Sequence, residues 1–504
     1  MMNKIDTFVM HSKYAPTMSK DADKSSIFNF HNTYTQLPEI FYSKIKLKPV
    51  PRPELVLFNE ELAEELNLKI ENRDSLPEIF SGNRIVENSA LIAQAYAGHQ
   101  FGHFTMLGDG RAVLLGEHIT EFGKKYDIQL KGSGQTPYSR GGDGKAVLKP
   151  MLKEYLFSES LHHLGVPTSR SLAVVKTEEK VYRTTSEPAA ILTRVFPGHI
   201  RVGTFQFARF MGEPDDLEKL LNYTIERHFP EIKNTENPAL ALLDTVMHLQ
   251  IELIVNWMRI GFIHGVMNTD NTAICGEAFD FGPCAFMGVY HPRTVFSSID
   301  TNGRYSFGNQ PQIIKWNLAR FAETLLERIH PDQDKALKIA TDKINAFDAL
   351  FNQYYYQMML GKIGIEFPIE NDWKLVDELL ILMRDHQKDY THTFNFLRLP
   401  EMFENKDFTL GEEFEAWISK WEKRLLKDGG KSRASSVMER YNPVYIPRNY
   451  FVEQALNQAV EGDFTPFYRL LDNMKYCYYY MEDMNDSLFA PENFDSNFQT
   501  TCGT

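Results

Sequence analysis

Hydrophobic and polar positions alternate most regularly in the first half of the chain. In YDIQLK (126–131) the first, third and fifth residues share one face of an extended strand, while Gln129 and Lys131 share the other. The runs SLAVVKT (171–177) and AILTRV (190–195) are apolar and of strand length. Glycines divide the stretch before them into turns and strands. These patterns predict a sheet from whose polar face Lys131 projects.

Apolar residues recur at helical spacing in two later stretches. After Pro150 they fall at positions 152, 155, 156 and 161, and Gly165 ends the pattern. This spacing predicts a helix with Glu154 in its first turn. The Asn-Pro pair at 237–238 begins a longer helix, whose apolar stripe at 243, 247, 251, 254 and 258 ends at Gly261. From position 316 onward the pattern is mainly helical.

Composition restricts the class of protein. The chain has 504 residues, of which 43% are hydrophobic and 24% charged, as is ordinary for a globular protein. The chain shows no uninterrupted run of the roughly 18 to 20 apolar residues that a membrane helix requires, and the opening residues lack a signal-peptide core. We therefore expect a cytoplasmic protein without a membrane partner. The net charge of −13 argues against nucleic acid as the main partner.

One short segment, HGVMNTDNTAICGEAFDFGP (264–283), carries the first candidate chemistry. Phosphoryl or nucleotidyl transfer needs oxygen ligands for Mg²⁺ and a carboxylate that can accept a hydroxyl proton. Asp270, Asn271 and Asp280 supply these groups, and Asp280 opens the D-F-G triplet of protein kinases. The segment lacks the kinase H-R-D-L-x-x-x-N pattern, and the triplet alone can arise by chance on a turn. It therefore needs support from the rest of the chain.

A glycine-rich, locally basic window supplies that support. Between Arg111 and Lys153 eight Lys or Arg residues accompany four Asp or Glu. The stretch GSGQTPYSRGGDGKA, directly after Lys131, has five glycines among fifteen residues, which leave backbone N–H groups open to phosphate oxygens. A flexible surface loop is the alternative. The charged residues within it, Arg140, Asp143 and Lys145, favour phosphate binding.

Three further charged residues fit a kinase-like site. Glu154 follows Lys131 by 23 residues, as the helix glutamate that positions a phosphate-binding lysine does in kinases. It could instead lie exposed and complement the helix dipole. Arg194 and Arg201 could bind phosphates in bidentate fashion, although structural pairing with a carboxylate is the more common role of a single arginine.

Longer motifs identify a family resemblance. YAGHQFG, LGDGRA, DIQLKGSGQTPYSRGGDGKAVL, SRSLAVV, LTRV with HIRVGTFQ, and GFIHGVMNTDN with FDFGP resemble the selenoprotein O family of kinase-like protein adenylyltransferases. The resemblance covers most of residues 90–320, and weaker similarity, in NPVYIPRNY and the terminal CGT, runs to the end. It implies a two-lobed kinase-like fold that binds ATP in reversed orientation and moves AMP to a protein hydroxyl.

The resemblance also implies roles for individual residues. Asp270 would accept the proton, Asn271 and Asp280 would bind Mg²⁺, with Mn²⁺ as an alternative, and Lys131 would pair with Glu154. The positions that match the family's nucleotide-binding residues are Gly108, Gly110, Arg111, Lys131, Asp143, Gly144, Arg194, Arg201 and Asp280. The partners implied are ATP and proteins that carry Ser, Thr or Tyr hydroxyls.

The predicted fold class is α+β, with two lobes flanked by additional segments. We assign residues 1–85 to an N-terminal extension, 86–195 to the N lobe, 196–340 to the C lobe with the catalytic loop, and 341–504 to a mainly helical C-terminal region with a short tail.

The chain departs from the resemblance at its cysteines. Position 502 is an ordinary cysteine rather than the selenocysteine of some members, and residues 294–300 offer no thiol for a redox-sensitive disulfide. Cys284 is the nearest candidate partner for Cys502. Without a C-x-x-C pair, structural zinc is not expected.

Three other activities remain open for the same residues. The site could support ordinary phosphorylation or use another nucleotide such as UTP with Mn²⁺, since metal ligands alone do not fix which phosphorus is attacked. A catalytically silent ATP-binding scaffold is the third alternative. The presence of Asp270, Asn271, Asp280 and Lys131 argues against it.

Overall fold

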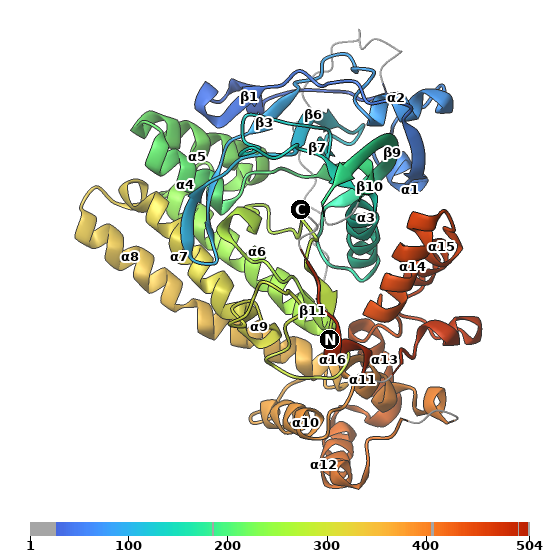
Figure 1. The fold of residues 1–504 in the computed structure, drawn as a ribbon. Coiled ribbons are helices and arrows are strands. Elements are labelled where there is room, and N and C mark those ends of the chain that lie inside the picture. Colours follow the sequence, from blue (N-terminus) through green and yellow to red (C-terminus); the bar gives the residue numbers. More distant parts are fainter. Residues whose placement is uncertain (1–26, 184–185, 405–407, 492, 502–504) are drawn as a thin grey trace.

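One large antiparallel sheet dominates the upper part of the molecule (Figure 1). The computed structural model describes residues 27–183, 186–404, 408–491 and 493–501. The sheet order is β1-β3-β6-β7-β10-β9-β2, with the short β8 paired to β10. The strands are β1 (Tyr42–Lys44), β2 (Glu54–Phe58), β3 (Ile92–Gln94), β6 (Ala112–Ile119), β7 (Lys125–Lys131), β8 (Ala146–Val147), β9 (Arg170–Tyr182) and β10 (Ser186–Phe196).

The strand that carries Lys131 lies near the middle of this sheet. β7 pairs with β6 on one side and with β10 on the other, so that Lys131 stands opposite Leu192. Its apolar residues Ile128 and Leu130 are fully buried, as the alternating pattern predicts. The chain thereby places Lys131 at the end of a central, well-supported strand.

A single long helix, α3 (Leu148–His163), packs against β9 and β10 below the sheet. It begins two residues before Pro150, because proline is tolerated within the first turn, where backbone N–H groups have no helical acceptor. Glu154 is therefore the seventh residue of the helix and lies in its second turn. The prediction of a first-turn position was wrong, and the alternative of an exposed side chain does not hold, because Glu154 is buried. We call the sheet with α3 the N lobe.

Residues 27–85 are part of this lobe. β1 and β2 come from this segment and form the two edges of the sheet. Its described α-helices are α1 (Glu60–Glu65), which is capped by the Asn59 side chain, and α2 (Leu76–Phe80). The domain boundaries given above stay predictions.

The C lobe consists of the helices that follow β10, and α6 forms its centre. Asn237 caps α6 (Pro238–Ile260), and Gly261 ends it in the left-handed conformation, as the sequence predicts. Around it lie α4 (Val202–Met211), α5 (Pro214–His228), α7 (Gln310–Ile329), α8 (Gln333–Asn345) and α9 (Phe347–Lys362). By length and composition α6 could span a membrane, contrary to our expectation, but over half of its apolar window is buried inside the protein.

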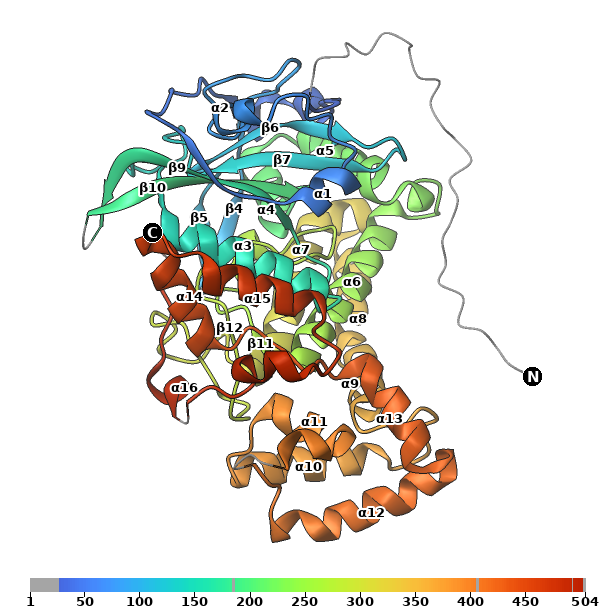
Figure 2. The same ribbon diagram turned by 90° about the vertical axis from the view of Figure 1, so that its right-hand side faces the viewer.

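The C-terminal region is helical and returns to the N lobe. In Figure 2, α14 and α15 lie beside α3, while α10 to α13 form a group below. These helices are α10 (Trp373–Asp385), α11 (Tyr390–Arg398), α12 (Glu415–Leu425), α13 (Gly430–Tyr441), α14 (Asn449–Glu461), α15 (Thr465–Lys475) and α16 (Phe494–Asn497). The arrangement confirms a two-lobed α+β fold with an additional helical region.

Candidate active site

The catalytic segment is a loop held between two short strands. β11 (Phe262–Ile263) continues from α6 and pairs with β12 (Ala285–Phe286), so that residues 264–284 project toward the N lobe. Thr269–Asn271 form one 3-10 turn inside the loop. Asp280 has a φ of 66°, in the left-handed region that non-glycine residues rarely adopt. Such strain is typical of functional positions.

Four charged side chains from both lobes meet at this loop. Lys131 forms ion pairs with Glu154 and with Asp280. Arg194 from β10 donates to Glu154 at 2.5 and 3.0 Å, and its Nη2 lies 3.5 Å from Asp280 Oδ1. Strand, helix and D-F-G segment thus meet through Lys131, as they do in protein kinases. For Arg194 the structure shows carboxylate pairing, and its predicted phosphate contact stays a prediction.

The two carboxylates of this cluster are held ionised. Burial alone would raise the pKa of Glu154, but the charges of Arg194 and Lys131 outweigh it and lower that pKa below its usual value. Burial likewise opposes ionisation of Asp280, yet Lys131, Arg194 and Arg111 hold the pKa of Asp280 well below its ordinary range. The Asp280 side chain is 35% exposed and can therefore still accept a ligand.

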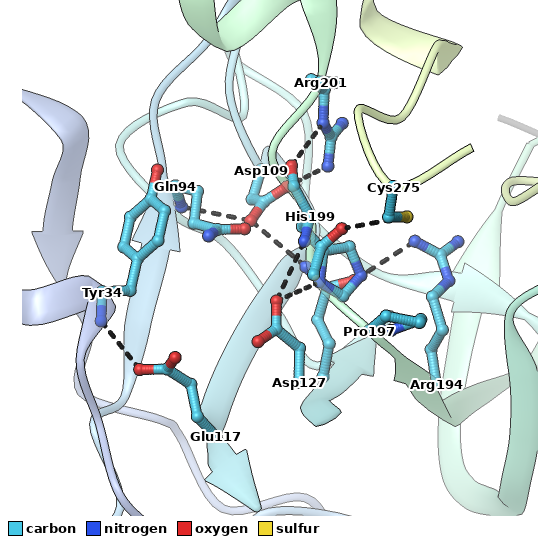
Figure 3. Close-up of polar contacts among 12 residues, drawn as sticks. Tyr34, Gln94, Asp109, Glu117, Asp127, Arg194, Pro197, His199, Arg201 and Cys275 are labelled. Atoms are coloured by element: carbon cyan, nitrogen blue, oxygen red, sulfur yellow. Dashed lines mark hydrogen bonds and ion pairs between the residues drawn. The ribbon is translucent and has the colours of Figure 1, made fainter. Parts of the chain in front are cut away.

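Arg201 is held by a second polar network, drawn in Figure 3. Its guanidinium lies 3.9 Å from Asp109 Oδ1, and its Nε donates to the His199 carbonyl oxygen at 3.1 Å. Nη1 donates to the Asp270 carbonyl oxygen at 3.3 Å. The guanidinium also stacks 4.0 Å from the Tyr96 ring centroid. These contacts orient Arg201 toward the catalytic loop.

Behind Arg201 the network continues to Asp127. Asp127 Oδ2 accepts from the His199 backbone N–H at 3.0 Å and lies 2.9 Å from its Nδ1. Burial holds the pKa of His199 well below its ordinary value, so the neutral ring donates from Nδ1. Arg227 pairs with the other Asp127 oxygen at 2.7 Å. Asp127 thereby fixes the segment that presents the carbonyl to Arg201.

The glycines at this site allow close backbone approaches. A Cβ at Gly108 would lie 2.3 Å from the Tyr138 ring, and one at Gly110 would lie 2.8 Å from the Tyr138 carbonyl oxygen. Gly144, with a φ of 69°, lies so close to Gly134 that a Cβ would fall 2.2 Å from its backbone. Asp143 pairs with Arg183 at 2.9 Å and accepts from the Lys145 N–H. The glycine-rich loop is therefore packed and ordered, not loose.

A cavity of about 540 Å³ lies among these elements. It brings together every predicted nucleotide-binding, catalytic and metal-binding residue: Gly108, Gly110, Arg111, Lys131, Asp143, Gly144, Arg194, Arg201, Asp270, Asn271 and Asp280. Glu154 lines a neighbouring cavity of about 1160 Å³ that extends to the C-terminal segment. The predicted residues are thus adjacent in space, although they span more than 170 positions of the chain.

Asp270 is the carboxylate best placed to accept a proton. It is 7% exposed, and its Oδ1 has no hydrogen-bond partner among the described residues. Burial raises the pKa of Asp270 to about 6. A hairpin of β4 (Ala97–Gln100) and β5 (His103–Met106) covers it, and a Cβ at Gly98 would lie 2.3 Å from its Oδ1. The hairpin thus sets the position of the carboxylate.

Asn271 and Asp280 suit a hard divalent cation. Asn271 donates from Nδ2 to the Val266 carbonyl at 3.0 Å, and both Asn271 and Asp280 line the cavity. Within the described parts of the chain, no group of three or more His, Cys, Asp or Glu residues could hold a metal by itself. Mg²⁺ commonly binds one or two protein oxygens together with substrate phosphates, so the donor set fits.

Several residues of the site were not predicted. Asp109, Tyr96, Gln100 and Tyr138 line the cavity, and Asp127 and His199 support it from behind. The only signal in the sequence was the position of Asp109 between two glycines. Cys502 lies outside the described residues, so its link to Cys284 stays a prediction; the Cys284 thiol is buried, which raises its pKa to about 12.

Comparison with known proteins identifies the family to which this chain is similar. The family model for protein adenylyltransferase SelO matches residues 25–475. A protein nucleotidyltransferase YdiU of Clostridium perfringens (strain SM101 / Type A) is 50% identical over 489 residues, which are 96% of this chain and 100% of the relative. Another of that name from Anoxybacillus flavithermus is 51% identical over 482 residues, or 95% of this chain and 99% of the relative.

Solved structures match only weakly. The Toxoplasma gondii specific rhoptry antigen kinase domain is 10% identical at a TM-score of 0.22, covering 52% of this chain and 87% of that one. ROP2 from Toxoplasma gondii, described as having a protein-kinase fold and no enzymatic activity, is 11% identical at the same TM-score, covering 58% and 96%. Similarity at this level carries no argument about the site.

Proposed function

Because this chain belongs to the protein adenylyltransferase SelO family and is a protein nucleotidyltransferase, we propose that it transfers AMP from ATP to Ser, Thr or Tyr hydroxyls of other proteins. The observation that carries the proposal is the cavity of about 540 Å³, which Asp270 lines together with seven basic residues. These are Arg111, Lys131, Arg140, Lys145, Arg183, Arg194 and Arg201. A cavity with one proton acceptor and several cations suits attack on a polyphosphate.

The reaction we propose has one displacement step. The acceptor hydroxyl oxygen attacks the α-phosphorus of ATP, its proton passes to Asp270, and the bond between the α-phosphorus and the bridging oxygen breaks. Pyrophosphate leaves with the electron pair. Burial raises the pKa of Asp270, so its carboxylate is basic enough to take the proton. Asp270 lies within the 3-10 turn of the catalytic loop, which holds its backbone in place.

The basic residues bind the leaving group. Arg201 is held by Asp109 and by the His199 carbonyl, so it is pre-oriented and loses little freedom when it contacts a phosphate. Lys131 contacts both Glu154 and Asp280 and would reach the phosphates from the N lobe. The glycine-rich segments would add backbone N–H groups at Gly110 and Gly144, whereas those of Asp109 and Lys145 already donate to Gln94 and Asp143. The β4–β5 hairpin packs directly against Asp270 and shields this carboxylate on one side.

We propose that Asn271 and Asp280 hold Mg²⁺, with Mn²⁺ as an alternative. When bound, the cation would neutralise phosphate charge and orient the triphosphate. The left-handed backbone of Asp280 points its carboxylate toward the cavity and into contact with Lys131. Lys131 and the cation would then share one carboxylate.

Labelled nucleotides test this proposal. The purified protein is incubated with Mg²⁺, cell lysate and ATP labelled on either the α- or the γ-phosphate. We expect protein-bound label from α-labelled ATP only, and loss of that label with EDTA or in Asp280→Ala. Asp334→Ala, on an exposed carboxylate at the start of α8, is the matched control and should behave as wild type. UTP labelled on the α-phosphate tests the choice of nucleotide.

Other outcomes of the same experiment have clear meanings. Label from the γ-phosphate alone would make the protein a kinase. Equal or greater labelling from UTP would replace adenylyl by uridylyl transfer. No label from any nucleotide, with Asp280-dependent ATP binding retained, would leave an ATP-binding scaffold.

A further inference from the structure

The two faces of the β4–β5 hairpin meet different parts of the protein. In an antiparallel pair, side chains directly opposite each other share a face. Gly98 stands opposite Thr105, and His99 stands opposite Phe104. The Gly98 face abuts Asp270 and includes Gln100, which lines the cavity. The His99 face points away from the cavity, because the His99 ring contacts Gln206 of α4 and Trp316 of α7. The hairpin lies beside α4, below the sheet (Figure 2).

An exposed apolar patch lies on that second face. Phe104 and Met106 of β5 are 41% and 40% exposed, and Phe210 and Met211 at the end of α4 are 63% and 59% exposed. The Phe104 and Phe210 rings are in edge contact with centroids 4.9 Å apart, so the two elements form one surface. We call these four residues the hairpin patch. Exposed apolar residues gathered in this way mark interaction surfaces more often than single ones do.

The cationic side chain of Arg304 lies near the hairpin patch. The His99 ring touches both Phe104 (5.3 Å) and Trp316 of α7 (5.1 Å), and the Arg304 guanidinium stacks 5.0 Å from the Trp316 centroid. Arg304 also lies beside Gly102 at the turn of the hairpin. Within the described ranges no carboxylate forms an ion pair with Arg304, whose side chain is half-buried and whose Nε is enclosed without a hydrogen-bond partner. The capacity of this partly exposed guanidinium to pair with a carboxylate is therefore unused within the described parts of the chain.

The hairpin is rigidly coupled to the catalytic loop. The His99 N–H donates to Thr269 Oγ1 at 2.7 Å, and the Phe101 N–H donates to Asn268 Oδ1 at 3.1 Å. Thr269 and Asn268 directly precede Asp270. A chain bound on the patch would therefore lie a fixed distance from the proton acceptor, as an acceptor substrate requires.

We infer that the hairpin patch together with Arg304 is the docking surface for the acceptor protein, and that it selects segments with apolar side chains and a carboxylate near the target hydroxyl. This inference rests on the proposed function and names its second substrate. Two methionines and two phenylalanines, all partly exposed, can adapt to different apolar side chains. The surface thus accepts several sequences but favours acidic ones, in spite of the protein's net charge of −13.

Two simple polymers serve as acceptors in the test. One is a random copolymer of glutamate and tyrosine, and the other a random copolymer of lysine and tyrosine. Initial rates of label transfer from α-labelled ATP are measured against polymer concentration. Wild type should prefer the glutamate polymer. In Phe104→Ser with Phe210→Ser, the KM for that polymer should rise about 10-fold or more, while the Kd for ATP stays unchanged.

Two further variants separate docking from folding. Phe122→Ser removes an exposed phenylalanine, 83% exposed, from the turn between β6 and β7 and should behave as wild type. Arg304→Glu should abolish or reverse the preference for the glutamate polymer, and Arg304→Lys should keep it. Arg304→Glu tests the inference independently if the double variant fails to fold.

The results that overturn the inference differ from those that overturn the proposed function. If wild type transfers no α-label to any protein, adenylyl transfer itself fails. If wild type labels lysate proteins but neither polymer, or both polymers equally, the acidic docking surface is wrong. An unchanged KM in the double variant, or an unchanged preference in Arg304→Glu, would also refute it.

Discussion

At the scale of single residues, Gly98 controls the position of the proposed base. Its Cα approaches the carboxylate so closely that a Cβ would fall 2.3 Å from Asp270 Oδ1 and 2.9 Å from the Asp270 Cβ. An alanine side chain cannot rotate away from this contact, because its Cβ is fixed to the backbone. Asp270 would have to move instead.

We therefore expect Gly98→Ala to slow transfer without weakening ATP binding. A shift of about 1 Å in a reacting group can cost roughly 100-fold in rate, so kcat should fall between about 10- and 100-fold. Single-turnover kinetics with α-labelled ATP would measure the fall. Thr105→Val, directly opposite on β5, serves as the control. An unchanged kcat in Gly98→Ala would mean that Asp270 is not the proton acceptor.

Residue patterns indicated part of the site and missed the rest. Alternation along 126–131 placed Lys131 on the polar face, where the structure finds it in contact with Glu154. The spacing after Pro150 misplaced Glu154 by one turn, since the helix begins at Leu148. Asp109 and Asp127 could not be predicted as site residues. The sequence does not show whether a carboxylate is buried, and only the folded chain reveals its partners.

At the scale of elements, the connection between β10 and α4 presents the Arg201 side chain. Asp127 on β7 holds this connection by accepting two hydrogen bonds from His199, whose carbonyl then accepts from Arg201. Asp127 is not among the residues that line the cavity and is therefore a positioning residue. Its effect reaches the nucleotide through the backbone of a neighbouring element.

Asp127→Asn should weaken ATP binding, and the change in binding free energy should exceed the change in the free energy of unfolding. The amide retains only one oxygen acceptor and adds an N–H group that faces the donors from His199 and Arg227. Coupling through such contacts is worth about 0.5–2 kcal/mol, so the Kd for ATP should rise about 2- to 30-fold. Titration calorimetry with ATP measures it.

The matched control is Asp372→Asn in the C-terminal region. Asp372 is also buried and pairs with Arg424 at 2.8 and 2.9 Å, so its loss should lower stability by a similar route. It should leave the Kd for ATP unchanged. Equal effects of both variants on ATP binding would show that Asp127 acts only on stability.

The elements themselves were predictable where local signals agree. Asn237, Pro238 and Gly261 mark both ends of α6, and the structure confirms them. The β4–β5 hairpin was recognised only as turns and strands, since its role depends on α4 and the catalytic loop, which are distant in sequence. Sequence periodicity shows which face of an element is apolar but not which element covers it.

At the scale of the whole molecule, the C-terminal segment fastens the stretch after the D-F-G triplet. Thr500 donates its N–H to the Phe296 carbonyl at 2.8 Å and accepts from the Ser298 N–H at 2.9 Å. Its hydroxyl donates to the Pro283 carbonyl at 2.7 Å. The side chain of Thr500 is buried, so the hydroxyl contact is shielded from water.

Thr500→Val should lower the free energy of unfolding by about 1–3 kcal/mol, because the shape is kept while a buried carbonyl loses its donor. The urea midpoint of unfolding measures the loss. Thr501→Val changes the exposed neighbour and should have no effect. Equal midpoints for both variants would mean that the hydroxyl contact contributes nothing.

The origin of the sheet edges also has a consequence for how the chain folds. Both edge strands come from residues before 86, and β2 pairs with β9, with Glu54 opposite Lys176. A pairing between strands so far apart in sequence requires closure of a long loop and slows folding. During synthesis β2 must therefore wait, unpaired, until β9 leaves the ribosome, whereas β1 pairs with the nearer β3. Chaperones that shield exposed strand edges should bind the nascent chain in this interval and release it once β9 has emerged.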